Sequence, residues 1–135
     1  VLLSDWDGFR TEALPERVYL TGSVPYAWLF PQMAAVVHHG GAGTTAAGLA
    51  SGVPSIVTPF MGDQPFWAQR VHRLGVGPRP IPRRRLTVER LSEAIQIAVT
   101  DTEMRRAAAS LGESIRAEKG VAKAVAVITK GGTIG

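Results

Sequence analysis

The 135-residue sequence contains no cysteine, which excludes disulfide bonds and thiolate chemistry. No apolar run approaches the roughly 20 residues that span a bilayer, and the chain does not open with a signal peptide. The excess of positive charge is also small, because 15 lysines and arginines against 11 acidic residues leave a formal net charge of +4 at pH 7. A charge this small does not indicate nucleic-acid binding. These absences predict a cytoplasmic protein whose contact with membranes is at most peripheral.

The sequence does have the composition of a folded globular domain, with 45% hydrophobic and 19% charged residues. Short β-rich runs alternate with helical windows, a pattern typical of an α/β fold with a parallel sheet flanked by helices. Strands are predicted at residues 1–4, 18–21, 35–38 and 55–58, with a weaker extended stretch at 75–81. Helices are predicted at 26–32, 44–51, 64–74, 88–100, 102–119 and 121–129.

Residues 38–45 read His-His-Gly-Gly-Ala-Gly-Thr-Thr and lie between a predicted strand and a helix predicted to start at Thr44. The first amides of a helix have no intrahelical partner, and the helix dipole adds positive potential there. Because Gly41 and Gly43 have no side chains, a phosphate group can approach the main chain closely. Thr44 and Thr45 add hydroxyl donors at the same point. The stretch therefore predicts a binding site for a diphosphate.

The two histidines of this stretch are predicted to differ in role. A ring N–H donates to phosphate oxygen in either protonation state, so His39 is placed at the rim of the diphosphate site. His38 comes one step earlier on the strand and is expected to point to the opposite face, as a core histidine with satisfied hydrogen bonds. Since adjacent strand residues diverge, no metal site is expected at this pair.

Two other interpretations of the glycines stay open at this point. Residues 41–46 satisfy the G-x-G-x-x-A fingerprint of dinucleotide-binding proteins, and Asp63 follows at about the spacing of a ribose-binding acid. Against this, the helix must end near residues 52–54, well short of the usual crossover, and its strand is not the first of the sheet. Alternatively, the glycines serve only the tight packing of the helix on the strand.

A second polar group follows the next predicted strand. Asp63 and Gln64 stand together at the start of a helix, where the ligand crevice of a parallel sheet lies. A carboxylate accepts and an amide both donates and accepts, so the pair can read the diol of a sugar. The competing interpretation is helix capping, with Asp63 as the N-cap and Pro65 in the first turn. Capping explains Asp63 and leaves Gln64 unexplained.

Three weaker features receive structural interpretations. Asp5-Trp6-Asp7 matches the D-x-D pattern that holds Mn²⁺ or Mg²⁺ in some sugar transferases, but a polar loop is the preferred reading. The run of three arginines at 83–85 is expected to be solvated. Four aromatic side chains beside small apolar residues are predicted to lie in the core: Trp28, Phe30, Phe66 and Trp67.

Residues 25–82 contain the motifs W-L-F-P, H-H-G-G-A-G-T-T, G-D-Q-P-F-W and R-V-H-x-x-G-V-G-P in this order. Through them the chain resembles the donor-binding domain of nucleotide-sugar glycosyltransferases of the two-Rossmann-domain (GT-B) architecture. The resemblance is closest to the UDP-glucose:sterol glucosyltransferases and their bacterial relatives. It implies a Rossmann-like parallel sheet flanked by helices, the C-terminal half of a GT-B architecture.

Carried over by position, the resemblance assigns roles to three groups of residues. The donor diphosphate would be bound by His39, Gly41, Ala42, Gly43 and Thr44. The hydroxyls of the transferred sugar would be bound by Asp63 and Gln64, and main-chain atoms near Val24 would face the base. Plant natural-product members have a glutamate for the ribose where this chain has Ala47, and a base-stacking tryptophan that nothing here matches cleanly. UDP and dTDP therefore both stay open.

The resemblance implies that residues 1–135 are the nucleotide-sugar donor-binding domain of an inverting glycosyltransferase. The acceptor domain, with the catalytic base, and the first part of the donor domain would lie outside this chain, so the chain has no catalytic residue and is inactive alone. The donor would be a UDP-sugar, with UDP-glucose expected, and the acceptor a hydrophobic alcohol such as a sterol, with no metal or other cofactor. The alternatives are a non-catalytic nucleotide-sugar binding module and an NAD-dependent Rossmann oxidoreductase.

Overall fold

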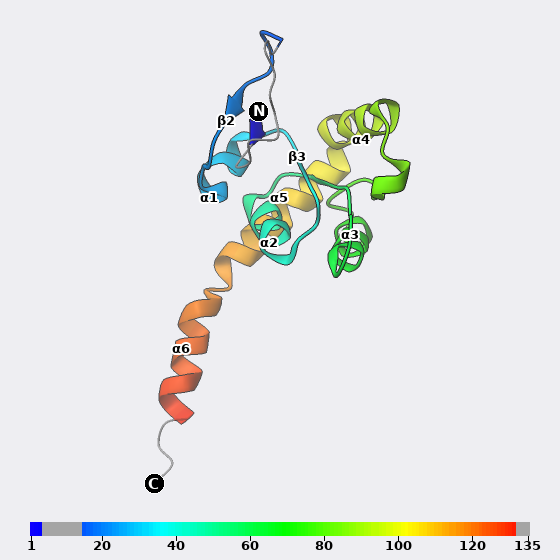
Figure 1. Cartoon of the computed structure of the whole chain (residues 1–135). Helices are drawn as coiled ribbons and strands as arrows, with labels where there is room; N and C mark the ends of the chain where they lie inside the picture. The colour runs from blue at the N-terminus through cyan, green and yellow to red at the C-terminus, as the bar shows by residue number, and fades with distance from the viewer. Residues whose placement is uncertain (4–14, 132–135) are drawn as a thin grey trace.

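The computed structural model describes residues 1–3 and 15–131. Two strands come first, β1 (Leu2–Leu3) and β2 (Leu20–Thr21). The middle of the chain holds α1 (Tyr26–Leu29), the 3₁₀ turn η1 (Phe30–Gln32), β3 (Val36–His38), α2 (Ala42–Ser51), β4 (Ser55–Val57) and α3 (Gln64–Arg73). The rest is helical, with η2 (Arg83–Arg85), α4 (Val88–Thr100), α5 (Thr102–Ala117) and α6 (Gly120–Gly131). The helices and strands match the predicted α/β order (Figure 1).

All strand pairs of the described residues are parallel, as the alternating pattern predicts. β1 pairs with β2, and β3 pairs with β4 with Val36 opposite Ser55 and His38 opposite Val57. The predicted strand at 75–81 is not formed as such. Its backbone instead bonds β4 at two points, because Ser55 N–H donates to Val76 O and Ile81 N–H donates to Val57 O. Prolines at 78 and 80 have no amide to donate, which prevents a continuous ladder.

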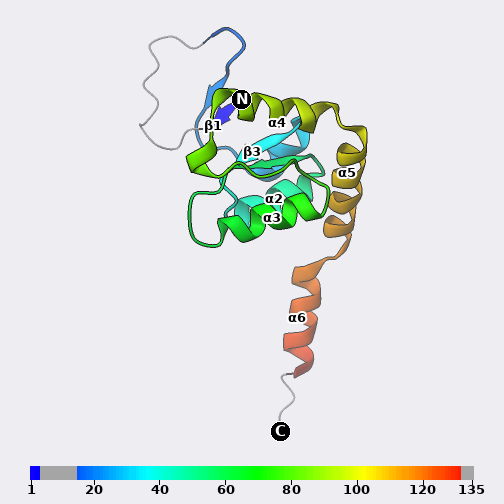
Figure 2. The ribbon, with the colours of Figure 1, turned by 90° about the vertical axis from the view of Figure 1, so that its right-hand side faces the viewer.

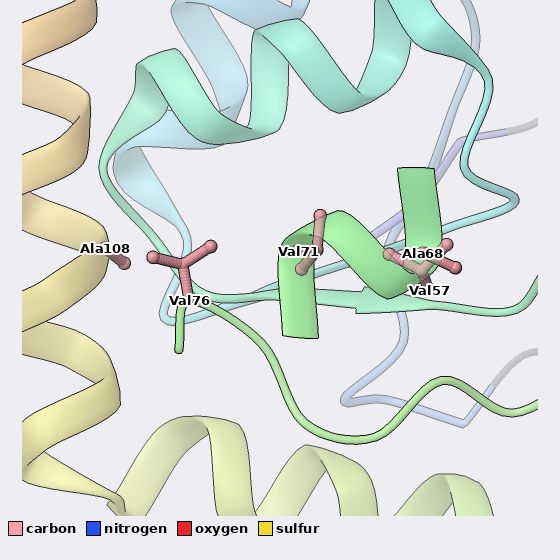
Figure 3. Close-up of a cluster of buried hydrophobic side chains, with 5 residues drawn as sticks. All are labelled: Val57, Ala68, Val71, Val76 and Ala108. Atoms are coloured by element: carbon pink, nitrogen blue, oxygen red, sulfur yellow. The ribbon is translucent and has the colours of Figure 1, made fainter. Parts of the chain in front are cut away.

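Helices cover both faces of the β3–β4 pair (Figure 2). On the α4 side, buried Ile56 packs with Ala94 and Ala98 of the helix. On the other side, Figure 3 shows Val57 with side chains of α3, α5 and the loop after α3, namely Ala68, Val71, Val76 and Ala108. Val57 and Ile56 are each only 1% exposed, so both faces of β4 are core. Burial on both faces explains why all three residues of β4 are buried and do not alternate between core and solvent.

The C-terminal end of α2 packs directly on α5 through glycines. A Cβ added at Gly112 would lie 2.6 Å from Gly52 Cα, so the two backbones approach more closely than any side chain permits. Gly52 ends α2 in the left-handed conformation, with φ +76°. The Arg116 guanidinium of α5 donates to Ala50 O, a carbonyl in the last turn of α2. These contacts fix the helix that carries the glycine-rich start.

Helix α6 leaves the body of the domain after Lys119, whose φ is +48° (Figures 1 and 2). Its side chains from 121 to 129 are all exposed, including Val121 and Ile128. In the described part of the chain, no helix combines the length and apolarity needed to cross a membrane.

Two expectations about aromatic packing are wrong. Phe30 is buried as predicted, but Trp28 is 62% exposed and Phe66 is 64% exposed. Trp67 is half-buried, with its ring edge against Phe66. Each exposed ring lies on the outer face of a helix, where neighbouring small residues in the sequence do not lie beside it in space. The arginines of η2 are exposed, as predicted.

Candidate functional site

The two polar groups predicted from the sequence lie at one edge of the sheet. Because β3 and β4 are parallel and in register, the segments that follow them leave from the same end. The segments touch at Gly40, where an added Cβ would lie 3.2 Å from Gln64 O and 2.7 Å from Val57 Cγ1. The structure therefore brings the glycine-rich stretch against the first residue of α3.

Helix α2 begins with amide groups that no side chain caps. Its N-cap is Gly41, and the first helical bond runs from Thr45 N–H to Gly41 O at 2.8 Å. The amides of Ala42, Gly43 and Thr44 precede that bond and therefore have no acceptor inside the helix. The helix starts two residues before the predicted Thr44, so these donors belong to its first turn, where the positive end of the dipole lies.

The glycines in and just before α2 have different structural roles. A Cβ at Gly43 would meet no atom within 4 Å, so the fold itself leaves that side of the first turn open. Gly48, further along α2, is a packing glycine, because its Cβ would lie 2.8 Å from Ser55 Oγ of β4. The interpretation that the glycines of residues 40–43 serve only tight packing fits Gly40, where an added Cβ would lie 2.7 Å from Val57 Cγ1, and does not explain Gly43.

The His39 ring lies over Gly41, and His39 itself is exposed. A Cβ at Gly41 would lie 2.5 Å from His39 Nε2 and 3.2 Å from its Cε1. Any side chain at position 41 would therefore displace the imidazole. The absence of one lets the ring nitrogen stand beside the first turn of α2, where it adds one more hydrogen-bond donor to the uncapped amides.

His38 is buried and His39 exposed, the alternation expected of neighbouring residues at a strand end. The expectation that His38 is a fully satisfied core histidine is wrong. Its Nδ1 accepts from Gly40 N–H at 3.1 Å, but its Nε2 has no partner. Burial, and then the nearby charge of His39, lowers the pKa of His38 to about 4. The side chain is therefore neutral at physiological pH.

The two threonines of the motif also differ in burial. Thr44 is half-buried beside the open first turn, whereas Thr45 is 1% exposed and its Oγ1 has no hydrogen-bond partner. The expectation that both hydroxyls serve the diphosphate site is wrong for Thr45. In a helix, consecutive residues point about 100° apart, so only one of the two can face the open side.

Asp63 and Gln64 are both engaged, but not in capping. Asp63 stands at the N-cap position of α3 with helical φ and ψ and makes no side-chain cap hydrogen bond. Its Oδ2 accepts from Trp67 Nε1–H at 2.9 Å. Gln64 Oε1 accepts two amides of the preceding loop, Phe60 N–H at 2.8 Å and Met61 N–H at 3.1 Å. Asp63 occupies the predicted N-cap position with Pro65 in the first turn, but its side chain does not cap the helix. Gln64 has a loop-holding role that its sequence position did not reveal.

Val24 follows β2 and lies half-buried against the cluster formed by Leu29, Phe30 and Val36. Ala47 of α2 packs on the same cluster, which places the loop at Val24 beside the helix that carries the glycine-rich start. The Asp5-Trp6-Asp7 pattern lies outside the described residues. Among residues 1–3 and 15–131, no group of three or more His, Cys, Asp and Glu side chains is arranged to hold a metal ion.

This layered α/β domain, with parallel strands and an uncapped helix at their carboxyl edge, is similar to the Rossmann-like half of GT-B glycosyltransferases. The glycosyltransferase of kitacinnamycin superposes on 92% of this chain with a TM-score of 0.83 and 32% identity, the match covering 32% of that chain. The glycosyltransferase VinC, solved in complex with dTDP, superposes on 88% with a TM-score of 0.72 and 27% identity, over 31% of its own chain.

The sequence comparison agrees with the structural one. Residues 1–129 match the model of the erythromycin biosynthesis protein CIII-like C-terminal domain, and the chain belongs to that family. The sterol 3-beta-glucosyltransferase UGT80A2 of Arabidopsis thaliana is 45% identical over 131 residues, which are 96% of this chain. The match covers 20% of that relative, so the chain spans about a fifth of its length. The oxidoreductase interpretation disagrees with this family membership.

Proposed function

We propose that this chain binds the nucleotide-sugar donor of a glycosyltransferase, with UDP-glucose as the donor and a hydrophobic alcohol such as a sterol as the acceptor. The observation that carries the proposal is the uncapped first turn of α2 beside the exposed His39 ring. Backbone amides at a helix start and a ring N–H are the donors that a diphosphate needs. The 45% identity to a sterol 3-beta-glucosyltransferase supports glucose as the transferred sugar and a sterol as the acceptor.

The same donors serve the chemistry. In the intact protein, a base from another part deprotonates the acceptor hydroxyl, which attacks the anomeric carbon of the sugar and displaces the nucleoside diphosphate with inversion. Negative charge grows on the leaving diphosphate as the bond breaks. The amides of Ala42, Gly43 and Thr44 and the His39 ring stabilise that charge without the need to reorganise. No catalytic base is assigned to this chain.

The sugar lies over the start of α3 in this proposal. Gln64 Oε1 is occupied by two loop amides, so its Nε2 is the group left to donate to a sugar hydroxyl. One carboxylate oxygen of Asp63 accepts from Trp67 Nε1–H, and in this proposal the second oxygen accepts from a sugar hydroxyl. The contact between Gly40 and Gln64 keeps the sugar pair next to the diphosphate donors. Main-chain atoms near Val24 face the base.

We also propose that donor binding needs no divalent metal, because the amides and His39 supply the neutralisation that a metal otherwise gives. Addition of EDTA to the intact protein should leave UDP affinity and turnover nearly unchanged. A strict Mn²⁺ or Mg²⁺ requirement would contradict this and direct attention to Asp5 and Asp7.

The direct test is turnover by the intact protein that contains this chain, with UDP-glucose or dTDP-glucose as donor and a sterol as acceptor. Sterol glucoside formed from UDP-glucose supports the proposal. Donor binding without transfer to any hydroxyl acceptor favours the alternative, a non-catalytic nucleotide-sugar binding module. A preference for dTDP-glucose would show that the nucleotide is dTDP and would leave the proposed reaction unchanged. The glycosyltransferase VinC was solved in complex with dTDP.

The sugar-binding role is tested by Asp63→Asn. An asparagine oxygen still accepts from Trp67 Nε1–H, so the local structure is kept, but the charged acceptor for sugar hydroxyls is removed. UDP-glucose affinity or turnover should fall while UDP affinity stays near that of the wild type. Equal loss of both affinities would show that Asp63 serves the structure of α3 only.

A further inference from the structure

The turn at Gly40 joins the two halves of the candidate site. Gly40 has φ +91°, a conformation that favours glycine, and an added Cβ would collide with Val57 Cγ1 and press on Gln64 O. The next residue is the N-cap of α2, and the preceding one carries the exposed imidazole. The geometry of this one turn therefore sets where the His39 ring and the first α2 amides lie relative to the start of α3.

A buried side chain holds that turn. Gly40 N–H donates to His38 Nδ1 at 3.1 Å, and Thr58 N–H donates to His38 O at 2.9 Å, so the ring and the backbone of His38 are both fixed. Since a neutral imidazole has one acceptor and one donor nitrogen, an accepting Nδ1 places the proton on Nε2. The bond is buried, where loss of one partner leaves the other costly to bury.

Packing alone does not explain a histidine here. Within the described residues, the Gly40 bond is the only hydrogen bond that the ring makes, and Nε2 is buried without a partner. Nε2 and Ser55 Oγ lie 3.5 and 2.8 Å from the place a Cβ on Gly48 would occupy, so both face the same small space under α2. A leucine would fill this space without an unpartnered nitrogen. The feature that leucine lacks is the Nδ1 acceptor.

We propose that His38 is a positioning residue, whose Nδ1 acceptor holds the Gly40 turn and thereby aims His39 and the first amides of α2 at the donor diphosphate. The inference rests on the proposed function, because it assumes that the diphosphate binds there. His38 itself does not touch the ligand. It acts through the amide of Gly40.

Two substitutions of His38 with side chains of the same branching distinguish the effect of the hydrogen-bond acceptor from the effect of packing. His38→Asn keeps an acceptor oxygen at the position of Nδ1, whereas His38→Leu has the same branching and no acceptor. In the intact protein, UDP affinity measured by calorimetry should fall about tenfold in His38→Leu, the effect of one misplaced hydrogen bond, and stay near wild type in His38→Asn. Ser55→Ala changes the same buried space and leaves Nδ1 alone, so its UDP affinity should be unchanged.

The outcomes distinguish this inference from the function it rests on. Equal UDP affinity in wild type and His38→Leu, or equal losses in the Asn and Leu variants, overturns the positioning role alone. A wild-type protein that binds neither UDP nor dTDP overturns the proposed function as well.

A measurement on the wild-type protein keeps the test independent of variant folding. With ¹⁵N-labelled histidine and glycine, NMR should show His38 as the Nε2–H tautomer at pH 7, with the Gly40 amide signal shifting on addition of UDP. An Nδ1–H tautomer, or a Gly40 amide that does not respond to UDP, would contradict the proposal.

Discussion

The helices at the carboxyl edge of β3 and β4 begin differently from α4 and α5, which follow them in the chain. Helices α2 and α3 have no side-chain cap at their N-termini. Helices α4 and α5 are capped from their own sequence, with Thr87 Oγ1 accepting from Arg90 N–H and Asp101 Oδ1 accepting from Met104 N–H. Capping is worth about 1 kcal/mol, so a helix that lacks it has given up stability.

The absence of side-chain caps at α2 and α3 indicates that a ligand binds at these helix starts and not at those of α4 and α5. α4 and α5 are needed for packing, and their first amides are satisfied by the protein itself. At α2 the amides are left free on the open side of Gly43, and at α3 the polar side chains at the start are directed to a loop and to an indole instead of to helix amides. Uncapped donors at a sheet edge are available to an external anion. The predictions below test this division, from the largest expected effect to the smallest.

Acid should lower the free energy of unfolding of the domain through protonation of buried His38. Its pKa in the folded protein is about 4, below the ordinary value of 6.5, so the unfolded chain binds the proton more tightly. The stability contributed by neutral His38 is complete above about pH 6.5 and is lost as the pH falls toward 4, by roughly 3 kcal/mol in total. Chemical unfolding at several pH values measures this. His38→Asn should remove most of that slope, and an unchanged slope would contradict the assignment.

His39→Ala should weaken UDP binding by about 1.5 to 3 kcal/mol, the range for a hydrogen bond to a charged group. The side chain is exposed, so the melting temperature should hardly change. Calorimetric titration with UDP checks the first expectation and thermal unfolding the second. His72→Ala, which removes an imidazole from α3 without touching the glycine-rich start, is the matched control and should bind UDP normally.

Two glycines of α2 should respond in opposite ways to the same substitution. Gly48→Ala forces a Cβ to within 2.8 Å of Ser55 Oγ and should destabilise the domain by about 1 to 3 kcal/mol. Gly43→Ala places its methyl group in open space, so stability should be kept or rise by up to about 1 kcal/mol, while UDP affinity falls. Melting temperature and UDP affinity measured on both variants decide the matter. If Gly43→Ala binds UDP as well as wild type, the open side of α2 is not the diphosphate site.

The smallest effect is expected at the capped helices. Asp101→Ala removes the acceptor of Met104 N–H and should lower the free energy of unfolding by about 1 kcal/mol. UDP affinity should stay unchanged, because the α5 start is not part of the site. A loss of UDP affinity without a loss of stability would break the division between capped and ligand-facing helix starts.

Much of this fold could be predicted from sequence, because the helices α3 to α6 and the strands β3 and β4 are specified by local apolar patterning. α4 spans 88–100 as predicted, since Thr87 caps its start and Asp101 after its last residue caps the start of α5. The sequence predicts the start of α2 two residues late, because the first turn of this helix contains a glycine and no capping side chain. The missing capping side chain removes the sequence signal for the helix start, and it also leaves the first amides of α2 without an acceptor.

The errors at the site come from contacts between residues that sequence spacing does not relate. The bond of Gln64 Oε1 to Phe60 and Met61 depends on the path of the loop after β4. The burial of Thr45 and the unpartnered His38 Nε2 depend on how α2 lies on β4. The motif residues predict which side chains form the candidate site, and the packing shows which of their atoms the protein itself leaves without a partner.

The most direct test of the central claim compares UDP with uridine, and dTDP with thymidine, in calorimetric titrations of the intact wild-type protein. If the first turn of α2 and His39 form the diphosphate site, each diphosphate should bind at least about a hundredfold more tightly than its nucleoside, the effect of two or more charge-assisted hydrogen bonds. Equal affinity of nucleoside and nucleoside diphosphate would show that the uncapped amides do not bind the donor, and would contradict the account.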